Sequence, residues 1–215
     1  MRRHLKARYL GPALVALVMI ISGAVTSVRN TRVNLTRVAL VDRTRIVIIE
    51  LQSCLAAMTD METGHRGYLL TGDEVFLKPY HEADGSLDRH IDRLEELTRD
   101  RPGQAERIAE IRDTATRKQE EMERGLEEMR TNGPAAAAAV VATGRGRELM
   151  EHFRQLIGQM RQEEADQLEA RQKQLVRGFK ETNTVVVTTG TIAISAGVIG
   201  TLLLALFLMA KERQE

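Results

Sequence analysis

Two long stretches without a charged side chain constrain this 215-residue sequence more than any other feature. Residues 9–28 form the first stretch, and residues 184–210 form the second, longer one. A helix of about 20 apolar residues spans the hydrocarbon core of a bilayer, and a longer one fits by tilting. The sequence therefore predicts two transmembrane helices, with residues 29–183 as a separate domain between them.

The first stretch has a rival interpretation as a cleaved signal peptide. Small residues at positions 22–24 would suit the peptidase that removes such a peptide. The apolar core of a signal peptide is usually about 7–15 residues long, however, which is shorter than this stretch. The length favours an uncleaved membrane anchor.

Basic residues near both ends predict the orientation of the two helices. They lie in the short tails 1–8 and 211–215, at Arg2, Arg3, Lys6, Arg8, Lys211 and Arg213. Short segments rich in Lys and Arg stay in the cytoplasm, whereas long translocated domains largely escape this rule. Both tails are therefore predicted to be cytoplasmic, with residues 29–183 outside. Membrane lipid is an expected partner, and the arginine-rich segment 29–45 is one candidate for contact with its anionic headgroups. The alternative is that these arginines simply solvate a helix.

The composition excludes several classes of function. The sequence has 31 Lys and Arg against 30 Asp and Glu, and it has no Trp. A dedicated nucleic-acid binder needs a basic surface and often aromatic side chains on which bases stack, so nucleic acid is not an expected partner. The single cysteine rules out an intrachain disulfide and a metal cluster built from cysteines. We expect no cofactor and no metal.

Apolar residues between the two stretches recur at helical rather than strand spacing. Over residues 29–70 they form a stripe at Val41, Val47, Ile48, Leu51, Cys54, Leu55, Met58, Met61 and Tyr68. Similar stripes predict a second helix that ends near residue 100 and a third that ends near residue 131. A fourth begins near residue 147, and no strong helix breaker separates it from the second apolar stretch. A short helical piece bent by a proline (74–80) and an alanine-rich run (135–141) lie between these helices. The predicted fold class is all-α, an extracytoplasmic four-helix bundle whose long first and fourth helices continue into the two transmembrane helices.

Helix lengths add to this picture. The first and fourth helices have about 40 residues each, or roughly 60 Å at a rise of 1.5 Å per residue, and the middle two are shorter. The middle helices can therefore cover only the membrane-distal part of the long pair. The uncovered stems, near residues 32–49 and 168–180, are expected to pack on each other or on a second copy. Helices with both ends in a membrane can transmit small piston, tilt or rotation shifts.

Residues 61–80 carry the most distinctive run, Met-Glu-Thr-Gly-His-Arg-Gly-Tyr-Leu-Leu-Thr-Gly-Asp-Glu-Val-Phe-Leu-Lys-Pro-Tyr. It resembles the Glu-Thr-Gly-x-Arg-Gly-Tyr-Leu-Leu-Thr-Gly-Asp-Glu run of the CHASE family of extracellular sensory domains, type three. A second similar segment covers residues 141–150 and is followed by residues 160–164. The resemblance extends over nearly all of residues 30–180 and includes the flanking spans.

The resemblance implies a four-helix bundle, usually homodimeric, at the front of bacterial histidine kinases, cyclases or chemoreceptor-like proteins. It also implies an inner-membrane location and a cytoplasmic output domain or partner. The sequence departs from the family pattern by ending at Glu215, five residues after the second span. An excised input module, a truncated reading frame and a free-standing sensor all fit this ending. Any enzymatic output is expected downstream or in a partner, and no catalytic residue is expected in this chain.

The family-like residues are interpreted as a bundle lock that sets helix register. They are Glu62, Thr63, Gly64, Arg66, Gly67, Tyr68, Gly72 and Asp73 in the first run, with Glu163 and Glu164 on the fourth helix. Glu62 and Arg66 are four residues apart on a helix, so we expect them to pair. One of the two glutamates on the fourth helix is expected to meet Arg66. The alternative is that Arg66 contacts a ligand.

Three residues are candidates for contacts between two copies of the chain. Cys54 lies in an apolar row, which favours a buried core thiol, and an interchain disulfide is the alternative in an oxidising compartment. Gly197 and Gly200 belong to rows of small residues that recur every four positions, a spacing that allows close contact between membrane helices.

The histidines outside the spans show no paired spacing of metal ligands. Those between the two spans are His65, His81, His90 and His152, and we expect them to be solvated helix residues. The sequence as a whole predicts the sensory input module of a bacterial transmembrane receptor. The alternative is a membrane-anchored bundle that serves adhesion or scaffolding without signalling.

Overall fold

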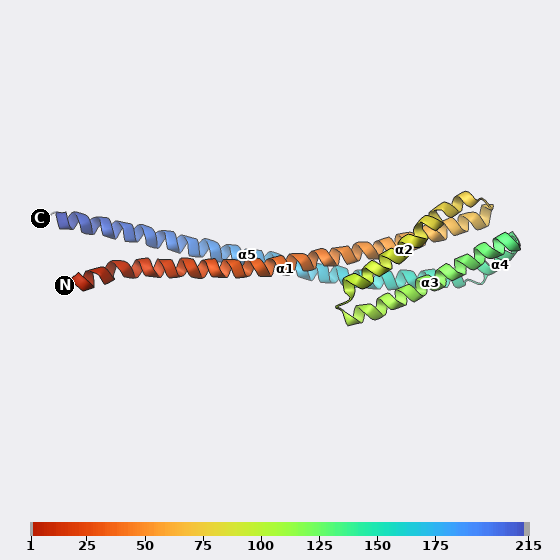
Figure 1. The fold of residues 1–215 in the computed structure, drawn as a ribbon, viewed down its shortest axis with the longest axis horizontal. Helices are drawn as coiled ribbons and strands as arrows, with labels where there is room; N and C mark the ends of the chain where they lie inside the picture. Colours follow the sequence, from red (N-terminus) through yellow and green to blue (C-terminus); the bar gives the residue numbers. More distant parts are fainter. Residues whose placement is uncertain (1, 213–215) are drawn as a thin grey trace. The chain divides into compact units, whose positions relative to one another are not determined.

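The computed structural model describes residues 2–212, and every element in this part of the chain is a helix (Figure 1). In chain order the elements are α1 (Arg2–Thr71), the 3-10 turn η1 (Glu74–Phe76), α2 (Leu77–Thr98), α3 (Pro102–Thr131), α4 (Pro134–Ala142) and α5 (Arg145–Glu212). The all-α prediction is therefore confirmed. The first and last helices are each continuous through the stems and the predicted spans.

The chain divides into two compact units. Unit 2 is Val41–Glu169, and unit 1 combines Met1–Leu40 with Ala170–Glu215. The helices α1 and α5 contribute to both units, whereas α2, α3 and α4 belong to unit 2 alone. The part of the chain with the hydrophobic core is thus shorter at both ends than the predicted domain 29–183.

Unit 2 is the predicted four-helix bundle with α4 as a short addition. Its core draws on α1, α2, α3 and α5, which present the apolar stripes that the sequence shows. The largest fully buried side chains are Leu51, Met58, Met61, Leu87, Ile91, Leu94, Ile108, Ile111, Met122, Met150, Phe153 and Ile157. Burial of a large apolar side chain contributes about 1.5–3 kcal/mol, so these residues dominate the stability of the bundle.

The turn after α1 follows from two residues of the family-like run. Gly72 has a φ of +72°, a left-handed conformation that glycine adopts without strain, and its N–H donates to the carbonyl of Tyr68 at 2.8 Å. Asp73 caps η1, since its Oδ1 accepts a hydrogen bond from the N–H of Val75 at 2.9 Å. The separate helical piece predicted for residues 74–80 is wrong. Pro79 lies in the first turn of α2, where a proline removes no hydrogen bond, so the piece merges with the second helix.

Unit 1 consists of the two long helices lying against each other. The Nη1 of Arg171 donates to the carbonyl of Leu40 at 3.3 Å, and Asn34 is buried. Gly23 lies so close to Thr189 that an added Cβ would come within 2.7 Å of its Cγ2. In this unit the two stems therefore pack on each other, one of the two arrangements that the helix lengths allow.

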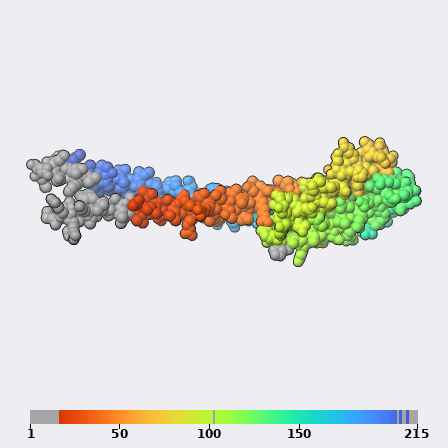
Figure 2. All heavy atoms as spheres, viewed as in Figure 1, coloured from red at the N-terminus to blue at the C-terminus, as the bar shows by residue number. Residues whose placement is uncertain are grey.

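Apolar side chains cover much of the described surface of unit 1. Figure 2 draws the α1 part of this surface in red to orange. From residue 17 on, the exposed side chains of α1 include Leu17, Val18, Ile20, Ile21, Val25 and Val28. Among the described residues, one segment, within Arg145–Leu203 of α5, is long and apolar enough to cross a membrane, with a mean hydropathy of 1.8 and no buried residues. Side chains 1–16 and 211–215 lie outside the described residues, and so do the tail charges and the start of the first span.

Candidate functional site

A cavity of about 430 Å³ lies in unit 2, where α1 and α3 meet the junction of α4 and α5. This volume is within the range of small-molecule sites, about 300–1,000 Å³. Its ionisable lining residues are Glu62, His65, Arg66, Lys118, Glu121 and Arg147. Apolar side chains, Met122, Val140, Val141 and Ala142, complete much of the wall. The second family-like segment, residues 141–150, therefore forms one side of the cavity.

The turn between α4 and α5 shapes that side. Gly144 has a φ of +76°, and its carbonyl accepts hydrogen bonds from the N–H groups of Arg147 and Glu148 at 3.1 Å each. A residue with a side chain would be strained in this conformation. The glycine thus allows α5 to start immediately beside the cavity.

Lys118 joins three helices at the cavity. Its Nζ donates to the carbonyl of Gly146 at 2.8 Å and to Oε1 of Glu62 at 3.4 Å. The lysine side chain is only 5% exposed, and burial lowers its pKa, while the charge of Glu62 opposes that shift. A buried ammonium needs such partners, so Lys118 ties α3 to α1 and to the first turn of α5.

The sequence analysis missed Lys118, although a signal was present. In α3 the buried positions Ile111, Ala115 and Met122 follow helical spacing, and Lys118 falls on the same stripe. A charged residue within an apolar stripe must find a buried partner or a cavity. That argument picks out Lys118 from the sequence alone, but not its partners.

Glu121 is a second buried charge beside the cavity. Its Oε2 lies 3.1 Å from Nη1 of Arg124 and 3.8 Å from Nε of Arg145. No hydrogen bond reaches this oxygen from the described side chains, so the two contacts are electrostatic without hydrogen-bond geometry. Glu62 is in a similar position, since its Oε2 lies 3.7 Å from Nη2 of Arg154. Each carboxylate of the cavity thus has two cationic neighbours.

The expected ion pair between Glu62 and Arg66 does not form. Glu62 turns to Lys118 and Arg154 instead, on helices α3 and α5. Arg66 is exposed, and neither Arg66 nor Arg147 makes an ion pair or side-chain hydrogen bond to the described residues. Two guanidinium groups at the cavity are therefore available to something outside this chain.

His65 is buried, which contradicts the expectation of a solvated histidine. Its ring packs against Gly125, where an added Cβ would lie 2.7 Å from Nε2. Burial, and then the charge of Lys118, lowers the pKa of His65 to about 4, so the ring is neutral at pH 7. By contrast, His90 lies 2.7 Å from Glu50 and His152 lies 3.3 Å from Glu110, on more exposed parts of the bundle.

The low pKa of His65 predicts a loss of stability in acid. Below pH 6.5 the unfolded chain binds a proton at this residue, whereas the folded chain does so only near pH 4. Its contribution is therefore complete above pH 6.5 and is lost as the pH falls toward 4, at a cost of about 3 kcal/mol. We expect His65→Gln to remove this part of the pH dependence in denaturant titrations at pH 7.5 and pH 4.5. An identical pH dependence in parent and variant would contradict the prediction.

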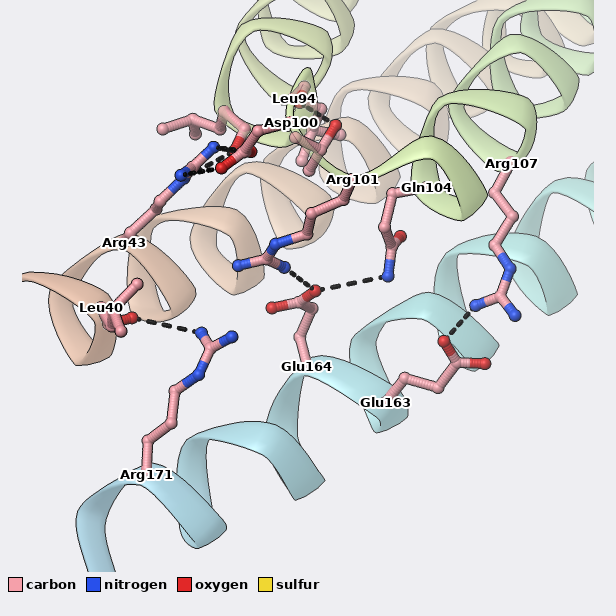
Figure 3. A network of polar contacts seen from close by, with 12 residues as sticks. Leu40, Arg43, Leu94, Asp100, Arg101, Gln104, Arg107, Glu163, Glu164 and Arg171 are labelled. Carbon is pink, nitrogen blue, oxygen red and sulfur yellow. Dashed lines mark hydrogen bonds and ion pairs between the residues drawn. The ribbon is translucent and has the colours of Figure 1, made fainter. Parts of the chain in front are cut away.

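A second polar cluster lies in unit 2 at the turn between α2 and α3 (Figure 3). Glu164 of α5 is fully buried, and its Oε1 accepts hydrogen bonds from Arg101 Nη1 at 2.6 Å and from Gln104 Nε2 at 3.5 Å. On the other side of the turn, Arg43 of α1 bonds to Asp100 and to the carbonyl of Leu97. This cluster joins the ends of α2 and α3 to both long helices.

The predicted contact of Arg66 with Glu163 or Glu164 is therefore wrong. Glu164 pairs with Arg101, which lies between α2 and α3 (Figure 3). Glu163 pairs with Arg107, which lies in α3. Both carboxylates do join the fourth helix to another helix or connection of the bundle, and their role as a bundle lock stays a prediction. The sequence did not indicate at which level of the bundle they act.

Comparison with known proteins agrees with this arrangement of helices and motifs. The profile of the CHASE3 domain matches residues 37–174, which is more than half of the chain. The chain belongs to the CHASE3 domain family. A CHASE3 domain is a sensory domain rather than a catalytic one, so this chain is a sensory input module of a signalling receptor. No curated protein matches the chain.

A solved structure shares the fold of this CHASE3 chain. The crystal structure of the sensor domain of the histidine kinase HK9 from Rhodopseudomonas palustris superposes with a TM-score of 0.54 at 23% sequence identity. The match covers 58% of this chain and 97% of that one. The four-helix sensor bundle is thus present in both proteins.

The CHASE3 motif residues divide between four places in unit 2. Glu62 and Arg66 line the cavity, whereas Gly72 and Asp73 form the turn after α1. Tyr68 is buried in the core, and Thr63 is exposed and donates to the carbonyl of its own helix at Thr59. In unit 1, no described residue outside their own helical turn comes within 4 Å of an added Cβ on Gly197 or Gly200, and their role between two copies stays a prediction.

Gly64 and Gly67 are where α1 approaches the start of α2. A Cβ on Gly64 would lie 2.7 Å from the carbonyl oxygen of Phe76 and 3.1 Å from the N of Tyr80. A Cβ on Gly67 would meet the ring of Phe76 at 2.6 Å. The two glycines therefore let η1, at Phe76, and the first turn of α2, at Tyr80, approach α1 closely.

Cys54 is a free cysteine with no exposed surface. Its burial agrees with the buried-thiol interpretation and disfavours a disulfide to a second copy. Burial, and then the charge of Glu50, raises the pKa of this thiol to about 12. Because only the thiolate is reactive, we expect Cys54 to react with a maleimide at pH 8 at least ~100-fold more slowly in the folded chain than in denaturant. A covalent dimer on non-reducing gels, or equal rates in both states, would disprove this.

Proposed function

We propose that the chain is the input module of a two-pass bacterial membrane receptor, with both termini cytoplasmic and residues 29–183 outside. In this proposal the spans are residues 9–28 and 184–210, flanked by the tails 1–8 and 211–215. Membership of the CHASE3 family and the apolar segment in α5 support it. A homodimer in contact with membrane lipid, acting on a cytoplasmic output domain or partner, completes the proposal.

One observation carries the mechanism, namely which helices border the cavity. Glu62, His65 and Arg66 lie on α1, and Arg147 lies in the first turn of α5. These are the two helices that continue into the predicted spans. A change at the cavity therefore acts directly on both of them, and a helix transmits an axial shift along its length.

Lys118 is the residue on which this coupling depends. Its ammonium group donates hydrogen bonds both to the carboxylate of Glu62 on α1 and to the carbonyl of Gly146 on α5. A ligand or a partner that alters this bridge changes the preferred position of one long helix relative to the other. Such a population shift is what a receptor needs in order to transmit a signal.

A chimera tests the proposed function. The chain is fused at Glu215 to the cytoplasmic part of a histidine kinase and reconstituted in lipid nanodiscs, and autophosphorylation is measured. We expect Glu62→Gln, which weakens the Lys118 bridge and keeps the side-chain shape, to change the kinase rate at least about threefold. Breaking one charge-assisted hydrogen bond of about 1.5–3 kcal/mol is sufficient for such a shift.

The matched control is Arg117→Gln, on the neighbouring residue of α3. Among the described residues Arg117 pairs with Asp113 of its own helix, at 3.5 Å, and both side chains are exposed. We expect this variant to leave the kinase rate unchanged. If Glu62→Gln and a proline at the exposed position Gln174 of α5 both leave the rate unchanged, the bundle does not signal, and the adhesion or scaffold alternative is favoured.

A further inference from the structure

We propose that the cavity between α1, α3 and the α4–α5 junction binds a small organic monocarboxylate with an apolar body. The ligand's carboxylate would lie at Arg66 and Arg147, and its apolar part would lie against Val140, Val141 and Met122. This inference rests on the proposed sensory function and names the ligand class of the same site.

The cavity carries an excess of positive charge. Lys118, Arg124, Arg145 and Arg154 already neutralise the two carboxylates of the cavity, each of which has two cationic neighbours. Arg66 and Arg147 remain without a carboxylate among the described residues. A site with surplus guanidinium groups attracts an anion, and the planar guanidinium matches a carboxylate in a bidentate geometry.

The remaining wall of the cavity is apolar. The C-terminal end of α4 contributes Val140, Val141 and Ala142, and α3 contributes Met122. Val141 is 55% exposed, so a ligand would remove apolar surface from water. Inorganic phosphate or sulfate would use the arginines but leave this wall bare, which favours an anion with a hydrocarbon body.

The same charges disfavour a ligand that also carries an ammonium group. An amino acid would need a free acceptor for its ammonium, and the oxygen of Glu121 without a hydrogen bond is the candidate. This oxygen lies within 3.8 Å of both Arg124 and Arg145, however, so an ammonium there would be repelled by two cations. A neutral His65 adds no negative charge. The simple carboxylate is therefore preferred over its amino-acid counterpart.

Binding to the full chain in nanodiscs, measured by isothermal titration calorimetry, tests this ligand class. Three probes share one carbon skeleton: 4-methylvalerate, its uncharged amide and L-leucine. Inorganic phosphate is the fourth probe, an anion without a hydrocarbon part. We expect 4-methylvalerate to bind at least about tenfold more tightly than each of the other three. Tighter binding of leucine or of phosphate, or equal binding of the amide, would overturn the proposal. So would the absence of binding by 4-methylvalerate.

Variants locate the site. We expect Arg147→Gln and Arg66→Gln each to weaken binding of 4-methylvalerate about tenfold, because each removes a charged hydrogen-bond donor. Both residues are exposed and unpaired within the described chain, so the melting temperature should stay unchanged. Arg117→Gln, at an exposed residue that does not line the cavity, is the matched control and should bind like the parent. Unchanged affinity in both cavity variants would place the carboxylate elsewhere and refute the assignment.

The binding experiment tests the ligand assignment, and the kinase chimera tests the sensory function, so the two hypotheses can be refuted separately. If the chimera responds to Glu62→Gln but 4-methylvalerate does not bind, the ligand assignment is wrong and the sensory function stands. If 4-methylvalerate binds but the chimera is insensitive to Glu62→Gln and to the proline at Gln174, the cavity is a binding site without a role in signalling.

Discussion

Replacing Arg101 by methionine is expected to lower the free energy of unfolding by about 3–5 kcal/mol. The reason is the burial of its partner, since Glu164 has no exposed surface and would remain as an uncompensated charge. The hydrogen bond from Gln104 at 3.5 Å is too long to replace the guanidinium. Chemical denaturation of the full chain, followed by circular dichroism, measures the effect.

The neighbouring ion pair supplies a matched control. Arg107 and Glu163 are joined in the same way between α3 and α5, but each side chain is 44% exposed. Water screens such a pair, so Arg107→Met should cost less than about 1 kcal/mol. The double variant Arg101→Met with Glu164→Leu should recover most of the lost stability, because it removes the buried charge together with its partner. Equal costs for the two single variants would contradict this account of the cluster.

Alanine at Gly64 is expected to destabilise the bundle by about 3 kcal/mol, at the upper end for overpacking. The added Cβ would meet the carbonyl of Phe76 and the N of Tyr80, both backbone atoms that cannot turn aside. The whole start of α2 would have to move away from α1. Loss of this contact would also displace Leu77 and Tyr80, which are buried in the core.

Gly158 is the control for helix propensity. It lies in the interior of α5, and nothing stands within 4 Å of an added Cβ. Gly158→Ala should therefore stabilise the chain by about 0.5–1 kcal/mol, because alanine favours the helix. Opposite signs for the two glycine-to-alanine changes in thermal melts are the expected result. A stabilising Gly64→Ala would show that α2 does not need this close approach.

Local features of the fold could be predicted from the sequence because they depend on neighbours along the chain. Helical spacing of apolar residues identified the stripes that now form the core. Gly72 and Asp73 end one helix and cap the next through contacts no more than four residues apart. Gly64 and Gly67 lie in one helical turn, and glycines inside a helix usually have a packing reason.

The partners of charged residues could not be predicted in the same way. Spacing along one helix suggested that Glu62 would pair with Arg66, but Lys118 on another helix supplies a cation that burial forces into contact. Glu164 likewise pairs with Arg101, 63 residues away in the chain. His65 looked like a surface residue because its helix position gives no sign that Gly125 leaves room for its ring.

The two uncharged stretches, the helical periodicity and the motif in residues 61–80 thus determined the class of this protein from the sequence alone. These signals are local, and each follows from the chemistry of consecutive residues. Only the tertiary structure decided which helices meet at the cavity and which charges remain unpaired there. The helices at the cavity and the pairing of its charges depend on how the four helices pack around the core. A buried charge pairs with the oppositely charged group that this packing places next to it.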